Sequence, residues 1–345
     1  MGPAFQTGRL VRAAFDTAQL GFERKRLLAR ARRKSPELTV VSDKTAQIKQ
    51  TDLLLFFCAK DEVIRLPFFL DYYRGLGVAH FIAVDNGSGD GSVSYLKDQP
   101  DCSIWLAKGS YKDARFGMDW LTHLQSCFAP GHWCLTVDPD EFFVFPHMDQ
   151  RPLQALLDWL DSGHIRSFGA ILLDMYSKKS VEDAQYRSGN DPLKTAPFFD
   201  PLNYQSLTEP FYLNAFIQGG PRQRVYFPDR PGFAPALNKI PLVKWSNGMV
   251  YRSSMHQLLP RSLNITYSYG AIPKPCGVLL HFKFLDTLVE KTKTELVQKQ
   301  HYASSREYKA YAAALSKTLW TPHSKKYKDW KQLEKLGLMS RGDWV

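Results

Sequence analysis

Short, uninterrupted apolar segments alternate with segments of helical spacing between residues 52 and 145, and this alternation strongly constrains the fold. A continuous apolar run is typical of a strand buried on both faces of a parallel sheet. Helical patterns such as VIRLPFFLDYYRGLG and YKDARFGMDWLTHLQSCFA lie between the runs and would supply the connections of βαβ units. The sequence therefore predicts an α/β fold with three layers and a mostly parallel sheet. Its first strands are expected at LLLFFCA, HFIAVD, CSIWLA and HWCLTVDPDEFFVF.

The pattern continues with less regularity to about residue 285. A helix is predicted at PLQALLDWLDSG and late strands at SFGAILLDMY and GVLLHFKFL. Residues 178–250 are rich in Pro, Gly and polar residues, so they are expected to form loops over the sheet. We divide the chain into a basic helical extension with a linker (1–50), a main domain (51–285, with halves 51–145 and 146–285) and a helical tail (286–345).

Positive charge is concentrated at both ends of the chain. Residues 1–50 hold 11 Lys and Arg against 4 Asp and Glu, and residues 283–345 hold 13 against 7. Basic ends attract nucleic acid or anionic lipid, or they are simply solvated helix faces. The basic helix predicted at Gly8–Lys34 would lie on a membrane surface, on the body of the protein or on a second subunit.

The expected location is the cytoplasm, with peripheral contact to the inner face of a membrane through the basic ends. No apolar run approaches the roughly 18 residues of a membrane-spanning helix. Basic residues interrupt the N-terminus where a secretory signal would be apolar. The five cysteines are scattered without CxxC spacing, which is typical of reduced thiols rather than of disulfides or a zinc cluster.

Three polar clusters follow apolar strands: KDE (Lys60–Glu62), DNGSGDGS (Asp85–Ser92) and DPDE (Asp138–Glu141). Because ligands bind beyond the carboxyl ends of strands in open α/β sheets, we expect the three clusters to form one site. Clustered carboxylates repel one another unless a cation lies among them, and oxygen ligands favour Mg²⁺ or Mn²⁺. A surface turn is the alternative reading of an isolated D-x-D.

These segments, in this order, resemble a GT-A-fold glycosyltransferase of the family 2 type, in the branch with KNE and VDNGSxDGT motifs. The resemblance covers about residues 51–285 and includes DARFGMDW and the D-x-D-E of DPDE. It implies a nucleotide-sugar-binding half (51–145) and an acceptor-side half (146–285). It also implies metal-dependent, inverting transfer of a sugar from a nucleotide-diphosphate sugar to a glycan or lipid-linked acceptor, in surface polysaccharide synthesis.

The resemblance assigns nucleotide contacts to four residues of the first half. Asp85 would accept hydrogen bonds from the base or ribose, and Lys60 and Glu62 would line the nucleotide pocket. Arg115 would lie near the donor phosphates or ribose. At Asp61 the branch more often has Asn.

The resemblance also implies a site for Mn²⁺ or Mg²⁺. Asp138 and Asp140 form the D-x-D that binds the metal and the diphosphate. His281, in LLHFKF, matches a further metal ligand from a late strand, and a satisfied core histidine is the alternative. Glu141 would be catalytic, would orient the sugar or would support its neighbours.

The base that takes the acceptor's proton has several candidates. Asp174 follows the strand GAILLDMY, and His256 lies in SSMHQL. Glu182–Asp183 resembles the acid pair of the family but lies in a polar loop. A mobile loop at Gly219–Arg224 would close over the donor, with its arginines or Lys239 meeting phosphate, unless these residues are simply solvated.

Two other functions also fit parts of the sequence. A phosphotransferase or phosphatase of the haloacid-dehalogenase type uses a D-x-D at the end of its first strand, whereas here three predicted strands precede it. A basic nucleic-acid binder would explain the charged ends, but no helix-turn-helix, zinc-finger or RNA-binding aromatic signature is found. We therefore expect an enzyme that does not bind nucleic acid, and an oligomer is compatible with the sequence.

Overall fold

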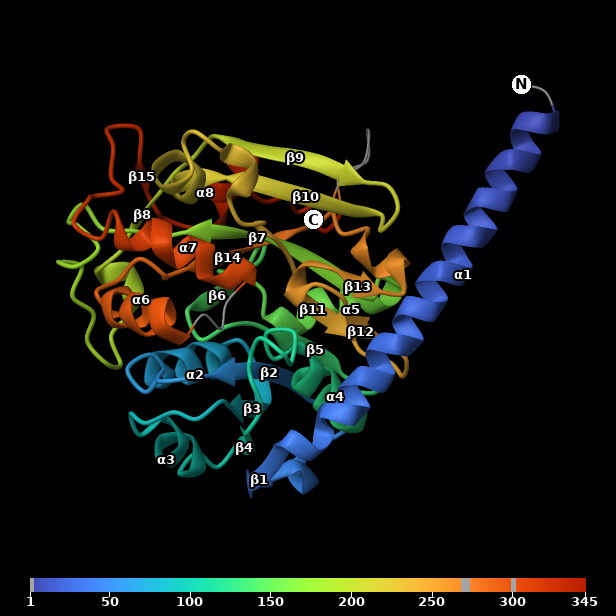
Figure 1. The fold of residues 1–345 in the computed structure, drawn as a ribbon, viewed down its shortest axis with the longest axis horizontal. Helices are drawn as coiled ribbons and strands as arrows, with labels where there is room; N and C mark the ends of the chain where they lie inside the picture. The colour runs from blue at the N-terminus through green and yellow to red at the C-terminus, as the bar shows by residue number, and fades with distance from the viewer. Residues whose placement is uncertain (1–2, 268–273, 299–301) are drawn as a thin grey trace.

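The computed structural model describes residues 3–267, 274–298 and 302–345, without side-chain detail for 3–15, 298 and 302–306. Within these residues the largest sheet has nine strands, in the order β1-β4-β3-β2-β5-β11-β7-β14-β6 (Figure 1). These strands are β1 (Leu38–Ser42), β2 (Leu53–Ala59), β3 (Val78–Asp85), β4 (Cys102–Ala107), β5 (Trp133–Thr136), β6 (Glu141–Val144), β7 (Ser167–Asp174), β11 (Asn238–Lys244) and β14 (Gly277–His281).

Most strands of the sheet share one direction. β2, β3, β4, β5, β7 and β14 run one way, and β1, β6 and β11 run the other. The predicted α/β fold with a mostly parallel sheet is therefore confirmed. The apolar runs become strands because both of their faces are buried, as the full burial of Leu54, Leu55, Phe56 and Phe57 in β2 shows.

Helices cover both faces of the sheet. The helices after the first strands are α2 (Leu66–Gly75), α3 (Ser92–Lys97), α4 (Met118–Phe128) and α5 (Leu153–Ser162). Leu55 and Phe57 of β2 pack in one apolar cluster with residues of α2 and α5, whereas Leu54 and Phe56 pack in another with Leu121 of α4. This alternation follows from the two-residue period of a strand.

The segment HWCLTVDPDEFFVF, predicted as one strand, forms two strands that lie far apart in the sheet. β5 lies beside β2 in the middle of the sheet, whereas β6 pairs antiparallel with β14 and forms the edge opposite β1. The chain turns between them at Asp138–Asp140, where the Glu141 N–H donates to the Asp138 carbonyl at 3.0 Å. Pro139 lacks an N–H for a ladder, so it favours the break.

The structure also corrects the prediction that residues 178–250 are loops over the sheet. β11 lies inside the sheet, antiparallel to both β5 and β7. Lys239 and Pro241 interrupt its apolar pattern, and its register with β7 shifts between Lys239 and Leu242. The short strands are β8 (Phe198–Phe199), β9 (Tyr204–Glu209), β10 (Asn214–Gly219), β12 (Val250–Tyr251), β13 (Leu258–Leu259) and β15 (Lys325–Lys326).

The helix predicted across YKDARFGMDWLTHLQSCFA begins only at Met118. Arg115, Phe116 and Gly117 have φ angles of 51°, 57° and 78°, and successive left-handed residues cannot belong to a right-handed helix. The remaining single turns are η1 (Ser35–Glu37), η2 (Thr45–Gln47), η3 (Pro192–Lys194), the π-helical η4 (Arg222–Tyr226), η5 (Pro231–Phe233), η6 (Ser254–His256) and η7 (Arg261–Asn264).

The N-terminal helix α1 (Pro3–Lys34) packs against the body through its C-terminal half and projects beyond it (Figure 1). Leu20 and Leu27 are buried against β12 and β13, and Arg30 Nε lies 2.7 Å from Asp119 Oδ2. Residues 38–42, expected as part of a linker, instead form the edge strand β1 because they pair with β4.

The C-terminal segment contains α6 (Thr287–Gln298), α7 (Tyr302–Ala312) and α8 (Trp330–Lys335). Among the described residues, no helix combines the length and apolar character needed to cross a bilayer.

Candidate functional site

Three polar loops meet at one edge of the sheet. β3, β2 and β5 are neighbours and parallel, with Ala59 opposite Asp85. The segments Lys60–Glu62, Asp85–Ser92 and Asp138–Glu141 follow these strands, so the sheet gathers them at its carboxyl edge, as the sequence predicted.

A row of ionisable side chains, which we call the acidic row, crosses the other half of this edge. Glu141, His281 and Asp174 lie opposite one another on β6, β14 and β7. His281 Nδ1 is 2.6 Å from Asp174 Oδ1, and His281 Nε2 is 3.5 Å from Asp140 Oδ2. His281 and Asp174 are buried, so this imidazole is held between two carboxylates inside the protein.

The charges of this row stabilise one another. Burial opposes charge on His281, but Asp140 and Asp174 outweigh it and raise the pKa of His281. Burial likewise opposes the charge on Asp140, and His281 and Arg65 nevertheless hold the pKa of Asp140 well below its usual range. Arg222 Nε lies 2.7 Å from Asp174 Oδ2, and against the effect of burial it lowers the pKa of Asp174.

A buried lysine lies between the two other acids of the D-x-D-E segment. Lys239 Nζ is 3.0 Å from Glu141 Oε1 and 3.6 Å from Asp138 Oδ2. Glu141 is buried, whereas the side chain of Asp138 is 40% exposed. Burial, only partly offset by Lys239, raises the pKa of Glu141 to about 7. The Asp138 N–H donates to Glu141 Oε2 at 3.2 Å, so Glu141 supports the loop as well.

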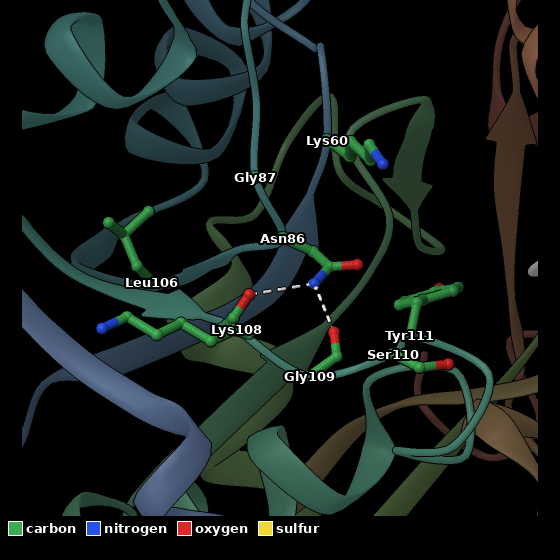
Figure 2. A pocket seen from close by; sticks show the side chains of 9 residues that line it. Lys60, Asn86, Gly87, Leu106, Lys108, Gly109, Ser110 and Tyr111 are labelled. Atoms are coloured by element: carbon green, nitrogen blue, oxygen red, sulfur yellow. Dashed lines mark hydrogen bonds between the residues drawn. The ribbon is translucent and has the colours of Figure 1, made fainter.

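A pocket of about 520 Å³ opens at the ends of β3 and β4. Figure 2 shows that Lys60, Asn86 and Tyr111 surround it. Burial, reinforced by the carboxylate of Asp138, raises the pKa of Tyr111 well above its ordinary value. The other lining residues are Gly87, Leu106, Ala107, Lys108, Gly109 and Ser110.

Asn86, rather than Asp85, faces this pocket. Asn86 Nδ2 donates to the carbonyls of Ala107 and Gly109, both at 3.0 Å, and the amide oxygen points away from them (Figure 2). The carboxylate of Asp85 is fully buried and accepts from the N–H groups of Gly87 and Ser88. Asp85 therefore shapes the loop that presents its neighbour.

Two predicted nucleotide residues have partners elsewhere. Glu62 is buried in ion pairs with Arg65 and Lys291 of α6. Arg115 donates to Asp119 of α4 at 2.7 Å and to the Tyr251 carbonyl at 2.7 Å. The structure thus places Arg115 at the packing of α4 against β12 and not among the lining residues of the pocket.

The candidate bases differ in their surroundings. Asp174 has both oxygens engaged, by His281 and Arg222. His256 contacts the Asn238 carbonyl through Nδ1, and burial together with the charge of Lys239 lowers the pKa of His256 to about 3. Glu182–Asp183 lies in the polar segment beyond β7, where Asp183 bonds to Ser180.

A divalent metal fits part of the predicted ligand set. Among the described residues, no group of three or more His, Cys, Asp or Glu side chains is preassembled to hold a metal. Asp140 and His281 nevertheless face each other, and Asp174 orients the opposite nitrogen of the imidazole, as carboxylates do behind metal-binding histidines. Mg²⁺ and Mn²⁺ sites often have few protein ligands and are completed by substrate phosphate and water.

Sequence reasoning missed several residues that the structure brings to the site. Asn86 lies in the DNGS loop beside the predicted Asp85, and Ser110 and Tyr111 follow β4. Extending the strand-end argument to β4 would have found the last two. Lys291 carries no local signal, because only the packing of α6 brings it to Glu62. Arg65 lies three residues after Glu62 and pairs with it locally.

No protein-family model matches the chain, and no curated protein matches it. The likeness to solved structures is slight, as two of them illustrate. A protein described as a glucose-1-phosphate thymidylyltransferase from Bacillus anthracis, in complex with sucrose, is 5% identical, covers 42% of this chain and 68% of its own, and has a TM-score of 0.24. A 4-diphosphocytidyl-2C-methyl-D-erythritol synthase is 17% identical, covers 44% and 72%, and has a TM-score of 0.25. Likeness of this extent assigns neither a family nor a function.

Proposed function

We propose that the protein is a metal-dependent glycosyltransferase that uses a nucleotide-diphosphate sugar. One observation carries the proposal: a pocket of about 520 Å³ and the acidic row lie along the same carboxyl edge of the sheet. The pocket is within the size range of small-molecule sites. The D-x-D-E and DNGS motifs, which suggested this class from the sequence, line the same edge. The acceptor in this proposal is a glycan or a lipid-linked glycan of surface polysaccharide synthesis.

The nucleoside of the donor would occupy the pocket. Asn86 would accept a hydrogen bond from the base or ribose through its amide oxygen, because its NH₂ group is committed to two carbonyls. Tyr111 would pack against a ring, and Lys60 would meet phosphate. Asp85 would act through the loop that it holds.

The diphosphate would lie toward the acidic row. Asp140 and His281 would hold Mn²⁺ or Mg²⁺, and the more exposed Asp138 would complete the ligands together with the donor phosphates. The ion would neutralise charge that develops on the departing diphosphate. Lys239, buried and 3.0 Å from Glu141, would keep Glu141 in place and add positive charge beside the same group.

We assign acceptance of the acceptor's proton to His256. Both oxygens of Asp174 and of Glu141 have protein partners. In His256 the contact to the Asn238 carbonyl makes Nδ1 the donor and leaves Nε2 as an acceptor. A diphosphate beside Lys239 would offset the positive charge that helps to lower the pKa of His256, and so would strengthen the base.

Thermal unfolding with nucleotide-sugars tests the donor site. A nucleotide-sugar that binds at 100 times its Kd stabilises the folded state by about 2.7 kcal/mol, so the matching donor should raise Tm in the presence of Mn²⁺. A panel with no effect on Tm would overturn the proposal. The double substitution Asp138→Ala, Asp140→Ala should abolish metal-dependent turnover, and retained turnover would refute the metal role of this pair.

We also propose an anionic membrane surface as a partner of α1. Its inner face is packed on the body, whereas Lys25, Arg26, Arg32 and Arg33 are exposed on its outer face, where Phe22 is also 72% exposed. Among the described residues these four cations form no ion pair. An aromatic side chain beside a cationic stripe suits an interface of lipid headgroups.

A further inference from the structure

The loop that carries Arg222 has a backbone suited to folding over the acidic row. Gly219 and Gly220 have φ angles of 143° and 63° and lead from β10 into η4. A Cβ at Gly219 would come within 2.0 Å of the Asn203 carbonyl oxygen. Only glycine fits there, so the chain can reverse closely against β9 and place Arg222 over the end of β7.

Arg222 and Asp174 form an ion pair that is almost free of solvent. Their side chains are 5% and 1% exposed, and Arg222 Nε lies 2.7 Å from Asp174 Oδ2. Arg222 Nη2 is buried without a hydrogen-bond partner among the described residues. A pair with an unsatisfied donor is a poor way to stabilise a fold, because an ion pair in the interior scarcely repays its desolvation.

Asp174 connects Arg222 to His281. Its second oxygen, Oδ1, is 2.6 Å from His281 Nδ1, and the opposite ring nitrogen faces Asp140. With both oxygens held, the carboxylate cannot rotate, and the imidazole keeps Nε2 directed at Asp140. The contacts therefore run in series from η4 to the two residues that fit a divalent ion.

η4 packs against residues from the C-terminal part of the chain. Tyr226, in η4, stacks on Phe284 with ring centroids 5.6 Å apart and meets the edge of Tyr311 of α7 at 4.8 Å. Phe284 follows β14 and lies three residues after His281. This packing thus holds the η4 loop in place next to the end of β14, the strand that carries His281.

We propose that Arg222 is a positioning residue for divalent-ion binding. Arg222, held in place by the packing of η4, fixes Asp174, and Asp174 orients His281 toward Asp140. The inference rests on the proposed function, because that function supplies the role of the ion. It adds that the affinity for the ion depends on the η4 loop, which contributes no ligand of its own.

Binding of Mn²⁺ alone, followed by electron paramagnetic resonance of the full-length protein, tests this proposal. Loss of a group behind a metal ligand typically lowers affinity about 10- to 100-fold, so Arg222→Gln should weaken Mn²⁺ binding by that factor. Arg222→Lys keeps a cation near Asp174 and should recover part of the loss. Arg224→Gln is the matched control, because Arg224 lies in the same turn but pairs with Asp200; its Mn²⁺ affinity should equal that of the wild type.

Asp174→Asn supplies a second variant if Arg222→Gln does not fold. It keeps the size of the side chain and should weaken Mn²⁺ binding similarly. Wild-type affinity in either folded variant would overturn the inference, as would equal losses in the Arg222 and Arg224 variants. Failure of the proposed function shows differently, as the absence of any Tm increase with nucleotide-sugars in the wild type.

Discussion

Individual ionisable residues at the carboxyl edge of the sheet are buried in pairs of opposite charge. His281 lies between Asp140 and Asp174, and Lys239 lies beside Glu141. Removing one member of a buried pair is strongly destabilising, because the other charge is left uncompensated. These contacts explain how the strand ends accommodate so many charges. They also mean that the charge of each residue depends on the partner beside it.

His256 is expected to make folding stability depend on pH. Burial and Lys239 lower the pKa of His256 to about 3, whereas in the unfolded chain it is about 6.5. Below about pH 6.5 the unfolded state binds a proton that the folded state excludes, and this favours unfolding. The stability that depends on neutral His256 is therefore complete above pH 6.5 and is lost as the pH falls toward 3.

Urea unfolding between pH 4.5 and 7.5 measures this contribution. The free energy of unfolding of His256→Gln should fall less steeply with decreasing pH than that of the wild type. His323→Gln, at an exposed position, removes one histidine without altering a buried site and serves as the control. Parallel pH profiles for the wild type and His256→Gln would contradict the prediction.

At the scale of elements, the sheet depends on close contact between β14 and its neighbours. Gly277 begins β14, and a Cβ there would come within 2.6 Å of the Val144 carbonyl oxygen and 2.9 Å of the Phe143 ring. Overpacking of a core typically costs about 1–3 kcal/mol, so Gly277→Ala should lower the free energy of unfolding by that amount. The exposed Gly75 has no atom within 4 Å of its Cβ position, and Gly75→Ala should change stability by less than about 0.5 kcal/mol. Equal stability of both variants in urea would refute the predicted contact.

The elements that local pattern predicts well are those whose neighbours in sequence are also neighbours in space. β2, β3 and β4 have continuous apolar runs and parallel partners joined by short helices, so their order follows from right-handed βαβ connections. The same reasoning brings Asp85 and Asp138 to one edge. These regularities predicted the class of the fold and the edge of the sheet that carries the candidate site.

Other elements are set by distant partners. DPDE separates β5 from β6, but only pairing with β14 shows that β6 lies at the far edge. β11 contains Lys239 and Pro241 and resembles a loop in sequence, yet Lys239 is buried because Glu141 and Asp138 balance its charge. The resemblance implies that Arg115 lies near the donor phosphates or ribose, whereas its contacts with Asp119 and Tyr251 depend on tertiary packing.

On the scale of the whole molecule, the basic N-terminus lies on a helix that is only partly used for packing. Leu20 and Leu27 fix one face of α1, and Glu23 and Arg30 form ion pairs with the body. The exposed cations lie on the opposite face, so an anionic surface can approach them without displacing α1. Such an orientation would hold the protein near a lipid-linked acceptor.

Flotation with anionic and neutral lipid vesicles tests this orientation. Each Lys or Arg near an anionic membrane contributes about 1 kcal/mol, so changing Lys25, Arg26, Arg32 and Arg33 together to Gln should weaken binding to anionic vesicles by about three orders of magnitude at low salt. Neutral vesicles should bind neither protein.

The matched control removes the same charge from the other basic end, and it should retain most of the binding because those side chains are not on α1. Equal losses in the two variants would show that net charge, rather than the outer face of α1, governs the interaction, and unchanged binding of the α1 variant would refute the membrane contact. The control changes the exposed Lys325, Lys326, Lys328 and Lys335 to Gln.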